Sequence, residues 1–315
     1  AFGLLSESRR PVLTSMLKVG SKTARISMAS SGDLFGLAEV SDYESAFPPR
    51  LRIYSIGNHK ITQMQAVSGP CFSLGSQICS VRNGFIASAP SSAFRWGSPG
   101  PFVYRISRKS YYSEQLPFPL IPYGESMSSS NDGKEVILCS KMNPEDCLII
   151  SDGVHRKIKS PSPVERFGIA TATSYNGSTH AIISLTKEHR HGLHFIKSNG
   201  DLINKFEPLN WETDPIRPDI PTMFFVSDKA LIVFFKERQS IARFHYTKGS
   251  WVLESENYLA FNACTYSNKV FYCLHDQAVK ILDGKLVQTD EFPIETESNL
   301  TQIVAGNDWF AILED

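Results

Sequence analysis

A short run rich in histidine, KEHRHGLHF, is the segment whose residue types are best suited to binding a metal ion. It contains His189, His191 and His194, and Glu188 lies directly before them. On a strand, His189 and His191 would point to the same side, as two ligands of one metal must. No Cys or Asp motif nearby completes a set of ligands, and a histidine in a turn is usually solvated. We therefore expect neither a metal site nor a cofactor here.

Motifs for covalent or phosphate chemistry are missing as well. The sequence has no G-x-S-x-G nucleophile elbow and no H-E-x-x-H metalloprotease motif. The Gly133-Lys134 pair in NDGKEV lacks the preceding glycine and the following hydroxyl of a phosphate-binding loop. Two carboxylates for glycoside hydrolysis could be drawn from many loops, so none is assigned. We expect no catalytic residues.

Aromatic and arginine side chains, which are enriched at binding hot spots, gather in the longer segments between apolar runs. Prolines in the same segments, such as Pro48, Pro99 and Pro215, would stiffen them and lower the entropy lost on docking. The alternative is that these rings fold back and cover the ends of strands. The candidate partner-binding residues are Tyr43, Phe47, Arg50, Phe94, Arg95, Trp96, Arg190, Trp211 and Arg217.

The charge balance argues against nucleic acid or a membrane as the main partner. The sequence has 32 basic and 32 acidic residues, so it has no global field that attracts polyanions. Arg9-Arg10 and ISRKSYY from Ile106 are short basic patches, which leave nucleic acid as a minor option. The longest apolar run, ALIVFF from Ala230, has the length of a strand and cannot cross a bilayer. We expect proteins or peptide segments as partners.

Six cysteines fall into three local pairs, spaced as cross-strand neighbours of hairpins would be. An oxidising compartment could close them, and the sequons at Asn176 and Asn299 would then accept glycans. The interpretation we favour is buried, reduced thiols in an intracellular protein, cytoplasmic or nuclear, with a secreted, disulfide-bonded protein as the alternative. The pairs are Cys71 with Cys79, Cys139 with Cys147, and Cys264 with Cys273.

Tight β-hairpins are the elements that must position these residues. Phrases with β-branched or aromatic residues around a Gly, Asn or Asp turn recur along the chain, and a second, serine-rich hairpin precedes each one. The first kind is IYSIGNHKI, IISDGVHRKI, IKSNGDLINKF, FHYTKGSWVL and VKILDGKLV. The second kind is ISMASSGDLFGLAEV, ESMSSSNDGKEVILCS, ATATSYNGSTHAIISL, MFFVSDKALIVFF and FNACTYSNKVFYCL.

Two hairpins make four strands, and the unit recurs at roughly forty to fifty residues, the period of one propeller blade. We therefore predict an all-β chain, residues 1–315, that forms a single β-propeller domain of seven blades, with six blades as the fallback. A β-sandwich with a second domain and a β-helix are the competing folds. Blades are expected to begin near Thr23, Cys71, Tyr123, Phe167, Pro221 and Leu259.

The last blade is expected to join the two ends of the chain. LTQIVAGNDWFAILED from Leu300 supplies two strands, a and b, and FGLLSE and PVLTSMLKVG near the N-terminus would supply the outer two. Such closure leaves no free sheet edge. In each blade the a–b and c–d turns are short, whereas the b–c and d–a connections are long and carry the aromatic and arginine residues. One face of the ring is therefore the predicted binding face.

The blade pattern resembles the WD40-like propeller superfamily, although the Trp-Asp and Gly-His dipeptides of regular WD40 repeats are missing from the expected places. IVAGNDWFAILED from Ile303 is similar to the strand pair of an RCC1-like repeat. The resemblance implies the architecture and the habit of intracellular propellers of holding partners in an assembly. We thus expect a non-catalytic interaction platform, a scaffold subunit of a larger complex. The alternative is a propeller enzyme, hydrolase- or glycosidase-like, or a small-ligand binder at the mouth of the central channel.

Overall fold

The computed structural model shows strands joined by turns, and no helix occurs among the residues it describes. No candidate for a membrane-crossing helix is therefore found in that part of the chain. The structure describes residues 2–5, 11–15, 23–41, 50–57, 60–68, 74–90, 102–107, 110–115, 123–140, 145–161, 164, 166–206, 220–294, 296, 299–306 and 309–314.

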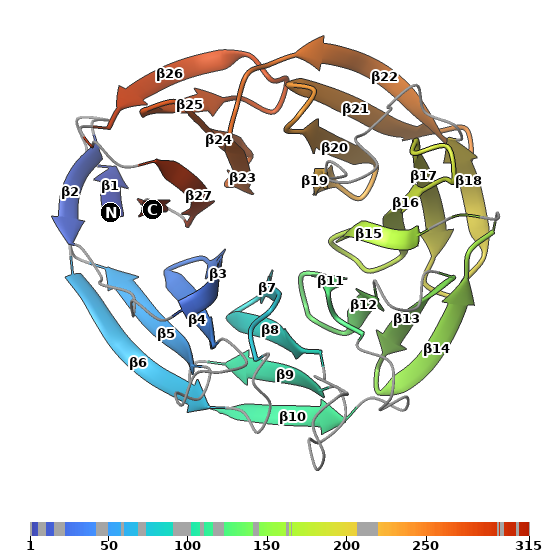
Figure 1. Ribbon diagram of the computed structural model, residues 1–315, viewed down its shortest axis with the longest axis horizontal. Coiled ribbons are helices and arrows are strands. Elements are labelled where there is room, and N and C mark those ends of the chain that lie inside the picture. The colour runs from blue at the N-terminus through green and yellow to red at the C-terminus, as the bar shows by residue number, and fades with distance from the viewer. Residues whose placement is uncertain are drawn as a thin grey trace.

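Seven four-stranded antiparallel sheets, called blades 1 to 7 here, are arranged around a centre (Figure 1). In blades 1 to 6 the strands follow chain order from the inside outward and are called a, b, c and d. Blade 1 is β3 (Thr23–Ser31), β4 (Leu34–Ser41), β5 (Arg50–Gly57) and β6 (Lys60–Ser68), and blade 2 is β7 (Ile78–Val81), β8 (Gly84–Ala89), β9 (Phe102–Ser107) and β10 (Tyr111–Gln115). Blade 3 is β11 (Ser126–Ser129), β12 (Glu135–Cys139), β13 (Asp146–Ser151) and β14 (Val154–Lys159), and blade 4 is β15 (Arg166–Thr173), β16 (Thr179–Leu185), β17 (His191–Lys197) and β18 (Leu202–Phe206). Blade 5 is β19 (Thr222–Ser227), β20 (Ala230–Phe235), β21 (Ser240–Thr247) and β22 (Ser250–Tyr258), and blade 6 is β23 (Ala263–Ser267), β24 (Val270–His275), β25 (Ala278–Leu282) and β26 (Gln288–Pro293).

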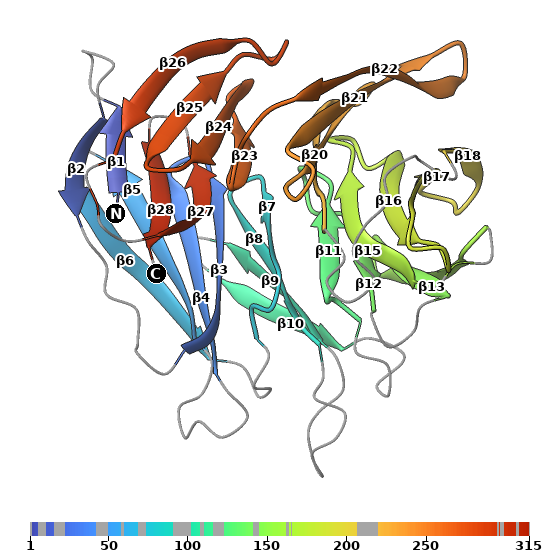
Figure 2. The ribbon, with the colours of Figure 1, turned by 45° about the horizontal axis from the view of Figure 1, so that its top comes forward.

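Blade 7 closes the ring with strands from both ends of the chain. It combines β27 (Leu300–Ala305) and β28 (Trp309–Glu314) with β1 (Phe2–Leu5) and β2 (Pro11–Ser15). β1 pairs with β28, with Leu4 opposite Trp309. Figures 1 and 2 both place the two chain ends side by side in this blade. The predicted closure of one blade by strands from both ends of the chain is confirmed.

The a strands of neighbouring blades contact one another all the way round, from β3 through β7, β11, β15, β19 and β23 to β27, which again contacts β3. A closed ring of this kind is a β-propeller, so the predicted fold class is confirmed, and the described residues form seven sheets rather than the six of the fallback.

A separate apolar cluster fills each of the seven interfaces between neighbouring blades. β20 shows why its sequence, ALIVFF, is apolar at every position. Leu231, Val233 and Phe235 pack toward blade 4, while Ile232 and Phe234 pack toward blade 6. A strand buried on both faces reads as a continuous apolar run instead of an alternating one.

Several blade boundaries differ from the sequence prediction. Blade 2 begins at Ile78 rather than near Cys71, blade 3 at Ser126 rather than Tyr123, and blade 6 at Ala263 rather than Leu259. The reason is that apolar residues of the preceding connections, such as Tyr123 and Phe261, are buried between blades without being part of a strand. Because these connection residues are buried, they are apolar and resemble the start of a strand in the sequence.

The short a–b and c–d turns all lie at one end of their blades, because consecutive strands are antiparallel. We call this end of the ring the short-turn rim and the other end, where the b–c and d–a connections begin and finish, the long-loop rim. Residues 42–49, 91–101 and 207–219, which belong to those connections, lie outside the described residues.

Candidate functional site at the channel mouth

A central channel of about 470 Å³ runs between the a strands of all seven blades. Its described wall consists of serine, threonine, cysteine and apolar residues with two tyrosines, Tyr175 and Tyr266, and no Asp, Glu, Lys, Arg or His is among them. General acid–base chemistry needs a titratable group within hydrogen-bond reach of the substrate. The described wall offers hydroxyl groups and one thiol for this purpose and no carboxylate or imidazole.

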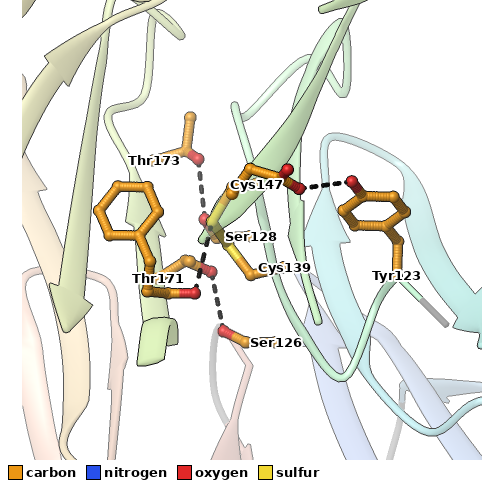
Figure 3. Close-up of a disulfide and its surroundings, with 9 residues drawn as sticks. Tyr123, Ser126, Ser128, Cys139, Cys147, Thr171 and Thr173 are labelled. Carbon is orange, nitrogen blue, oxygen red and sulfur yellow. Dashed lines mark hydrogen bonds between the residues drawn. A yellow bond between two sulfur atoms is a disulfide. The ribbon is translucent and has the colours of Figure 1, made fainter. Parts of the chain in front are cut away.

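The hydroxyl groups of the wall join one blade to the next. Ser128 and Thr173, from the a strands of blades 3 and 4, are hydrogen-bonded at 2.8 Å, and Ser126 and Thr171 at 3.3 Å (Figure 3). The Ser27 hydroxyl likewise donates to the carbonyl of Ser76 at 3.2 Å. The serine-rich character of the a strands is thus explained by contacts between blades.

On the short-turn rim the channel opens into a cavity of about 640 Å³, which we call the short-turn mouth. Its walls come mainly from the a–b turns of blades 1, 2, 3, 4 and 6. Serine, asparagine and tyrosine dominate them, as they do in antibody loops that bind proteins. The lining residues are Ser30, Ser31, Gly32, Asp33, Ser80, Val81, Arg82, Asn83, Asn131, Tyr175, Val226, Tyr266, Ser267, Asn268 and Lys269.

A complete circuit of hydrogen bonds holds the mouth, with one bond at each of the seven interfaces. Backbone groups alone form two of the bonds, and side chains take part in the other five. The donors and acceptors are Ser31 Oγ to Val81 O (2.5 Å), Arg82 N to Asn131 O (2.5 Å), Asn131 N to Tyr175 O (3.0 Å), Asn176 N to Asp228 Oδ1 (3.0 Å), Tyr266 Oη to Val226 O (3.5 Å), Ser267 Oγ to Gly306 O (2.8 Å) and Trp309 Nε1 to Gly32 O (3.1 Å). The a–b turns are therefore fixed by their neighbours as well as by their own strands, and the mouth is preformed.

Two tyrosines from blades 4 and 6 meet in this mouth. The hydroxyl groups of Tyr175 and Tyr266 are hydrogen-bonded to each other. Tyr175 is 43% exposed; its partial burial, the contact with Tyr266 and the charge of Asp228 raise the pKa of Tyr175 to about 12. Burial also raises the pKa of Tyr266. Both phenols are therefore neutral at physiological pH and serve as hydrogen-bonding aromatic surface.

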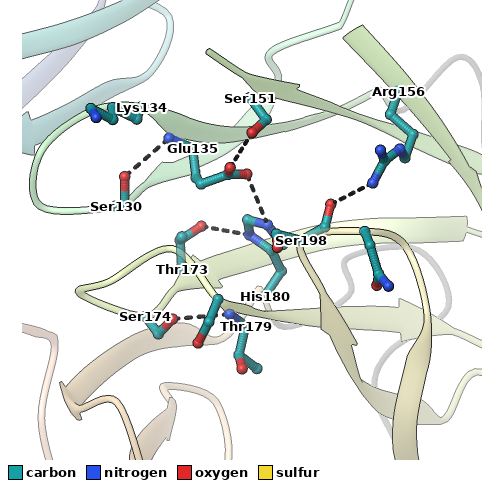
Figure 4. A network of polar contacts seen from close by, with 12 residues as sticks. Ser130, Lys134, Glu135, Ser151, Arg156, Thr173, Ser174, Thr179, His180 and Ser198 are labelled. Carbon is teal, nitrogen blue, oxygen red and sulfur yellow. Dashed lines mark hydrogen bonds and ion pairs between the residues drawn. The ribbon is translucent and has the colours of Figure 1, made fainter. Parts of the chain in front are cut away.

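A partly buried polar chain leads away from the channel wall between blades 3 and 4 (Figure 4). Thr173 Oγ1 is 3.0 Å from His180 Nδ1, His180 Nε2 is 4.0 Å from Glu135 Oε2, and the Ser151 hydroxyl donates to Glu135 Oε1. Burial lowers the pKa of His180 to about 4, so the imidazole is neutral. Because His180 is fully buried, it joins blades and does not reach a ligand.

Two of the predicted partner-binding residues lie within the described structure. Arg50 is exposed at the start of β5, and its backbone pairs with Glu39 and Ser68. Arg190 is half-buried in the turn before β17, where its amide donates to Thr186 Oγ1 at 3.3 Å. The other seven, Tyr43, Phe47, Phe94, Arg95, Trp96, Trp211 and Arg217, lie outside the described residues.

The histidine run does not come together as a metal site. His194 Nε2 is 2.8 Å from Ser184 Oγ and its ring packs edge-on against Phe167. The His191 ring packs on Phe235, and His189 lies in the turn with φ of 58°. No group of three or more His, Cys, Asp or Glu side chains that could hold a metal ion occurs in the described ranges.

Two of the three cysteine pairs are disulfide-bonded, so the expectation of reduced thiols is wrong for them. Cys139 lies directly opposite Cys147, and Cys264 opposite Cys273, with Cα atoms 4.4 and 4.2 Å apart. The predicted cross-strand placement is correct. Cys79 is a free thiol, and its predicted partner Cys71 lies outside the described residues.

The short-turn mouth was not predicted from the sequence, because aromatic and arginine residues gather in the long connections instead. A usable signal existed in SNK at Ser267, where the second central position of a tight turn holds Lys269 instead of glycine. Blade 2 was predicted without a hairpin phrase of its own, although Asn83-Gly84 is a turn signal for its first hairpin.

Comparison with known proteins supports the architecture. No family model and no curated protein matches the sequence. The structure is similar to the β-propeller domain of Cps50 (Swd1) from Myceliophteria thermophila, with a TM-score of 0.61, 11% identity, and 95% of this chain and 98% of that chain covered. By fold, the chain is a β-propeller.

Further solved structures show the same similarity. Hsv2 from Kluyveromyces lactis gives a TM-score of 0.53 at 15% identity, covering 77% of this chain and 76% of that chain. Hsv2 from Kluyveromyces marxianus gives 0.53 at 14% identity, covering 80% and 77%. At these identities the similarity of this β-propeller to them concerns the fold alone.

Proposed function

We propose that this β-propeller is a non-catalytic interaction platform, which holds partner proteins or peptide segments in an assembly. The observation that carries the proposal is the described channel wall. Seven a strands converge there, yet they present hydroxyl, thiol and apolar groups and no carboxylate, imidazole, ammonium or guanidinium. An enzyme with its active site in the channel would most often place a carboxylate or an imidazole on this wall. The Tyr175 and Tyr266 phenols are hydrogen-bonded to each other and have raised pKa values, so they are poorly suited to act as bases.

The partner surface that we propose is the long-loop rim, where the b–c and d–a connections begin and end. Its candidate residues are those predicted from the sequence, with Phe94, Arg95 and Trp96 as the central group. Long connections raised on a rigid ring are a common place for binding residues. The rigidity is supported by seven apolar interfaces and by the hydrogen bonds between blades.

The test is affinity capture from a lysate of the source organism, with the intact chain and with a triple variant, Phe94→Ala, Arg95→Ala and Trp96→Ala. We expect the variant to lose specific partners that the intact chain recovers. The matched control changes three exposed apolar residues on outer strands, Leu202, Val252 and Leu253, to alanine. Equal recovery by all three proteins would overturn the proposed face.

The compartment of the platform remains a prediction from the sequence, namely intracellular, with secretion as the alternative. The disulfides Cys139–Cys147 and Cys264–Cys273 favour the alternative, since disulfides persist mainly in oxidising compartments. Peptide mapping without reduction, on protein from its native source alkylated at lysis, decides between them. Linked cysteine peptides would support secretion, and alkylated ones the intracellular prediction.

A further inference from the structure

We propose that the short-turn mouth is a second binding site, which takes an acidic segment of a partner protein and places a carboxylate of that segment against Arg82 and Lys269. The mouth lies on the rim opposite the proposed partner face. The two proposals therefore rest on different residues and can fail separately.

The described lining of the mouth carries more positive than negative charge. Three charged residues line it: Arg82, Lys269 and Asp33. The side chains of both cations are exposed and make no ion pair or hydrogen bond with any residue of the described structure, whereas Asp33 already has a partner. The two phenols, Tyr175 and Tyr266, are neutral. Two cations against one carboxylate leave the lining with a net positive charge, which is complementary to the carboxylate of a ligand.

Lys269 has a left-handed backbone conformation in its turn. Three two-residue turns of the described chain have both central residues at positive φ. Asp152-Gly153 (45° and 78°) and Lys248-Gly249 (50° and 84°) place glycine second, as this turn type prefers. Asn268-Lys269 (50° and 64°) places lysine there. Glycine would adopt this turn with less strain, so the requirements of the fold do not explain the lysine. Strained positions of this kind gather at functional sites.

The backbone that presents Arg82 is held by both neighbouring blades. The amide of Arg82 donates to the carbonyl of Asn131 in blade 3, and the carbonyl of Val81 accepts from the Ser31 hydroxyl of blade 1. The turn that presents Arg82 is therefore fixed on both sides. A preformed site loses little conformational entropy on binding.

The shape and composition favour a peptide segment over a free anion. Val81, Arg82 and Asn83 also line a second cavity of about 500 Å³ between blades 2 and 3. The two cavities share this turn as a wall, so a peptide longer than the mouth would extend across it toward the second cavity, whose further charged residues are Arg105, Lys134, Glu114, Asp132 and Asp152. Amide and hydroxyl groups along the wall suit the backbone of such a chain, and the tyrosines supply aromatic contact area. A nucleic acid would call for a much larger basic surface than two side chains.

The experiment selects ligands without assuming a sequence. A phage library of random dodecapeptides is panned on the intact, immobilised chain, and selected peptides are synthesised with a fluorescent label and titrated by anisotropy. We expect enrichment of peptides that contain Asp or Glu, and a loss of affinity of about tenfold or more in the double variant Arg82→Ser, Lys269→Gly. Replacing the acidic residues of the peptides by Asn or Gln is expected to have the same effect.

A matched variant, Arg238→Ser with Lys248→Gly, removes two exposed basic residues elsewhere, one of them in an equivalent turn. It should bind the peptides as the intact chain does. The thermal midpoint of each variant confirms that it is folded. The proposal is overturned if no acidic peptides are enriched, if the double variant binds them equally well, or if the matched variant loses as much affinity. Displacement by millimolar inorganic phosphate alone would mark a simple anion site and also overturn it.

The variant Phe94→Ala, Arg95→Ala, Trp96→Ala separates the two proposals. Since it leaves the short-turn mouth unchanged, it should keep full affinity for the acidic peptides. Loss of these peptides in this variant would place their binding on the other rim and contradict the assignment.

Discussion

The indole nitrogen of Trp309 donates a hydrogen bond of 3.1 Å to the carbonyl oxygen of Gly32. The two residues are far apart in the chain, yet they join blade 7 to blade 1 and complete the circuit around the short-turn mouth. Gly306 lies against the indole ring of Trp309, and a Cβ atom at Gly306 would collide with that indole and with the Gly32 carbonyl. The closure of the propeller thus depends on side-chain packing as well as on the pairing of β1 with β28.

Replacing Trp309 by Phe should destabilise the protein by about 0.5–1.5 kcal/mol more than the loss of ring area alone, because the partly buried hydrogen bond to the Gly32 carbonyl is lost. Urea unfolding measures the change in the free energy of unfolding. Trp251→Phe is the matched control. The Trp251 ring is equally buried and stacks on Phe195 at 4.3 Å, but its indole nitrogen has no hydrogen-bond partner among the described residues. Equal losses in the two variants would show that the bond to Gly32 contributes nothing.

At position 269, glycine should be more stable than alanine by roughly 1–2 kcal/mol. Both variants remove the ammonium group, but alanine keeps the left-handed strain at φ of 64°, and glycine relieves it. The comparison is made by urea unfolding of Lys269→Gly and Lys269→Ala. Lys205 lies in strand β18, where φ is not positive, so Lys205→Gly should be less stable than Lys205→Ala by about 0.5–1 kcal/mol. The same order at both positions would contradict the strain at Lys269.

The fold could be predicted because hairpin turns and the apolar runs beside them recur at a fixed period. The closure of blade 7 was also predictable, since LTQIVAGNDWFAILED supplies half a blade and the N-terminus the other half. Boundaries were less accurate where a connection contributes to the core. Tyr123 has the residue type of a strand, but it lies in a connection, where its ring packs between blades 2 and 3 and its hydroxyl donates to Asp146 at 2.6 Å.

The candidate site was far less accessible to sequence analysis. The circuit around the mouth is made partly by backbone groups, such as the Arg82 amide and the Asn131 carbonyl, and side-chain identity does not encode those bonds. Residues from six blades line the mouth, and local spacing cannot reveal which turns converge. Arg50 and Arg190 were chosen for residue type, and the structure places them on blades 1 and 4 of the ring without showing a shared cavity.

Stability should fall as the pH is lowered from about 6.5 to about 4 because of His180. Its pKa is lowered to about 4 by burial, so below pH 6.5 the unfolded chain binds a proton that the native state does not. The loss is on the order of 3 kcal/mol and levels off below pH 4. Urea unfolding across this pH range measures it.

The variant His180→Asn removes the titration and should flatten that part of the profile. His245→Gln, at an exposed position on β21, is the control and should leave the slope as it is. A profile for His180→Asn as steep as that of the unchanged protein would assign the pH dependence to other groups.

Alanine substitutions at three glycines should separate backbone strain from close packing at the Cys139–Cys147 disulfide. Gly168 has φ of 88°, and a Cβ atom there would overlap Cys139 and lie 2.7 Å from Cys147 Sγ. Gly168→Ala should therefore cost about 2–5 kcal/mol, the sum of left-handed strain and overpacking. Gly249 has φ of 84° with nothing near its Cβ position, so Gly249→Ala should cost only about 1–2 kcal/mol. Gly57 has neither feature, and Gly57→Ala should be neutral or slightly stabilising, by up to about 1 kcal/mol. Urea unfolding ranks the three. A cost at Gly168 no larger than that at Gly249 would mean that blade 4 can move away from the disulfide without loss, against the close packing seen between blades 3 and 4.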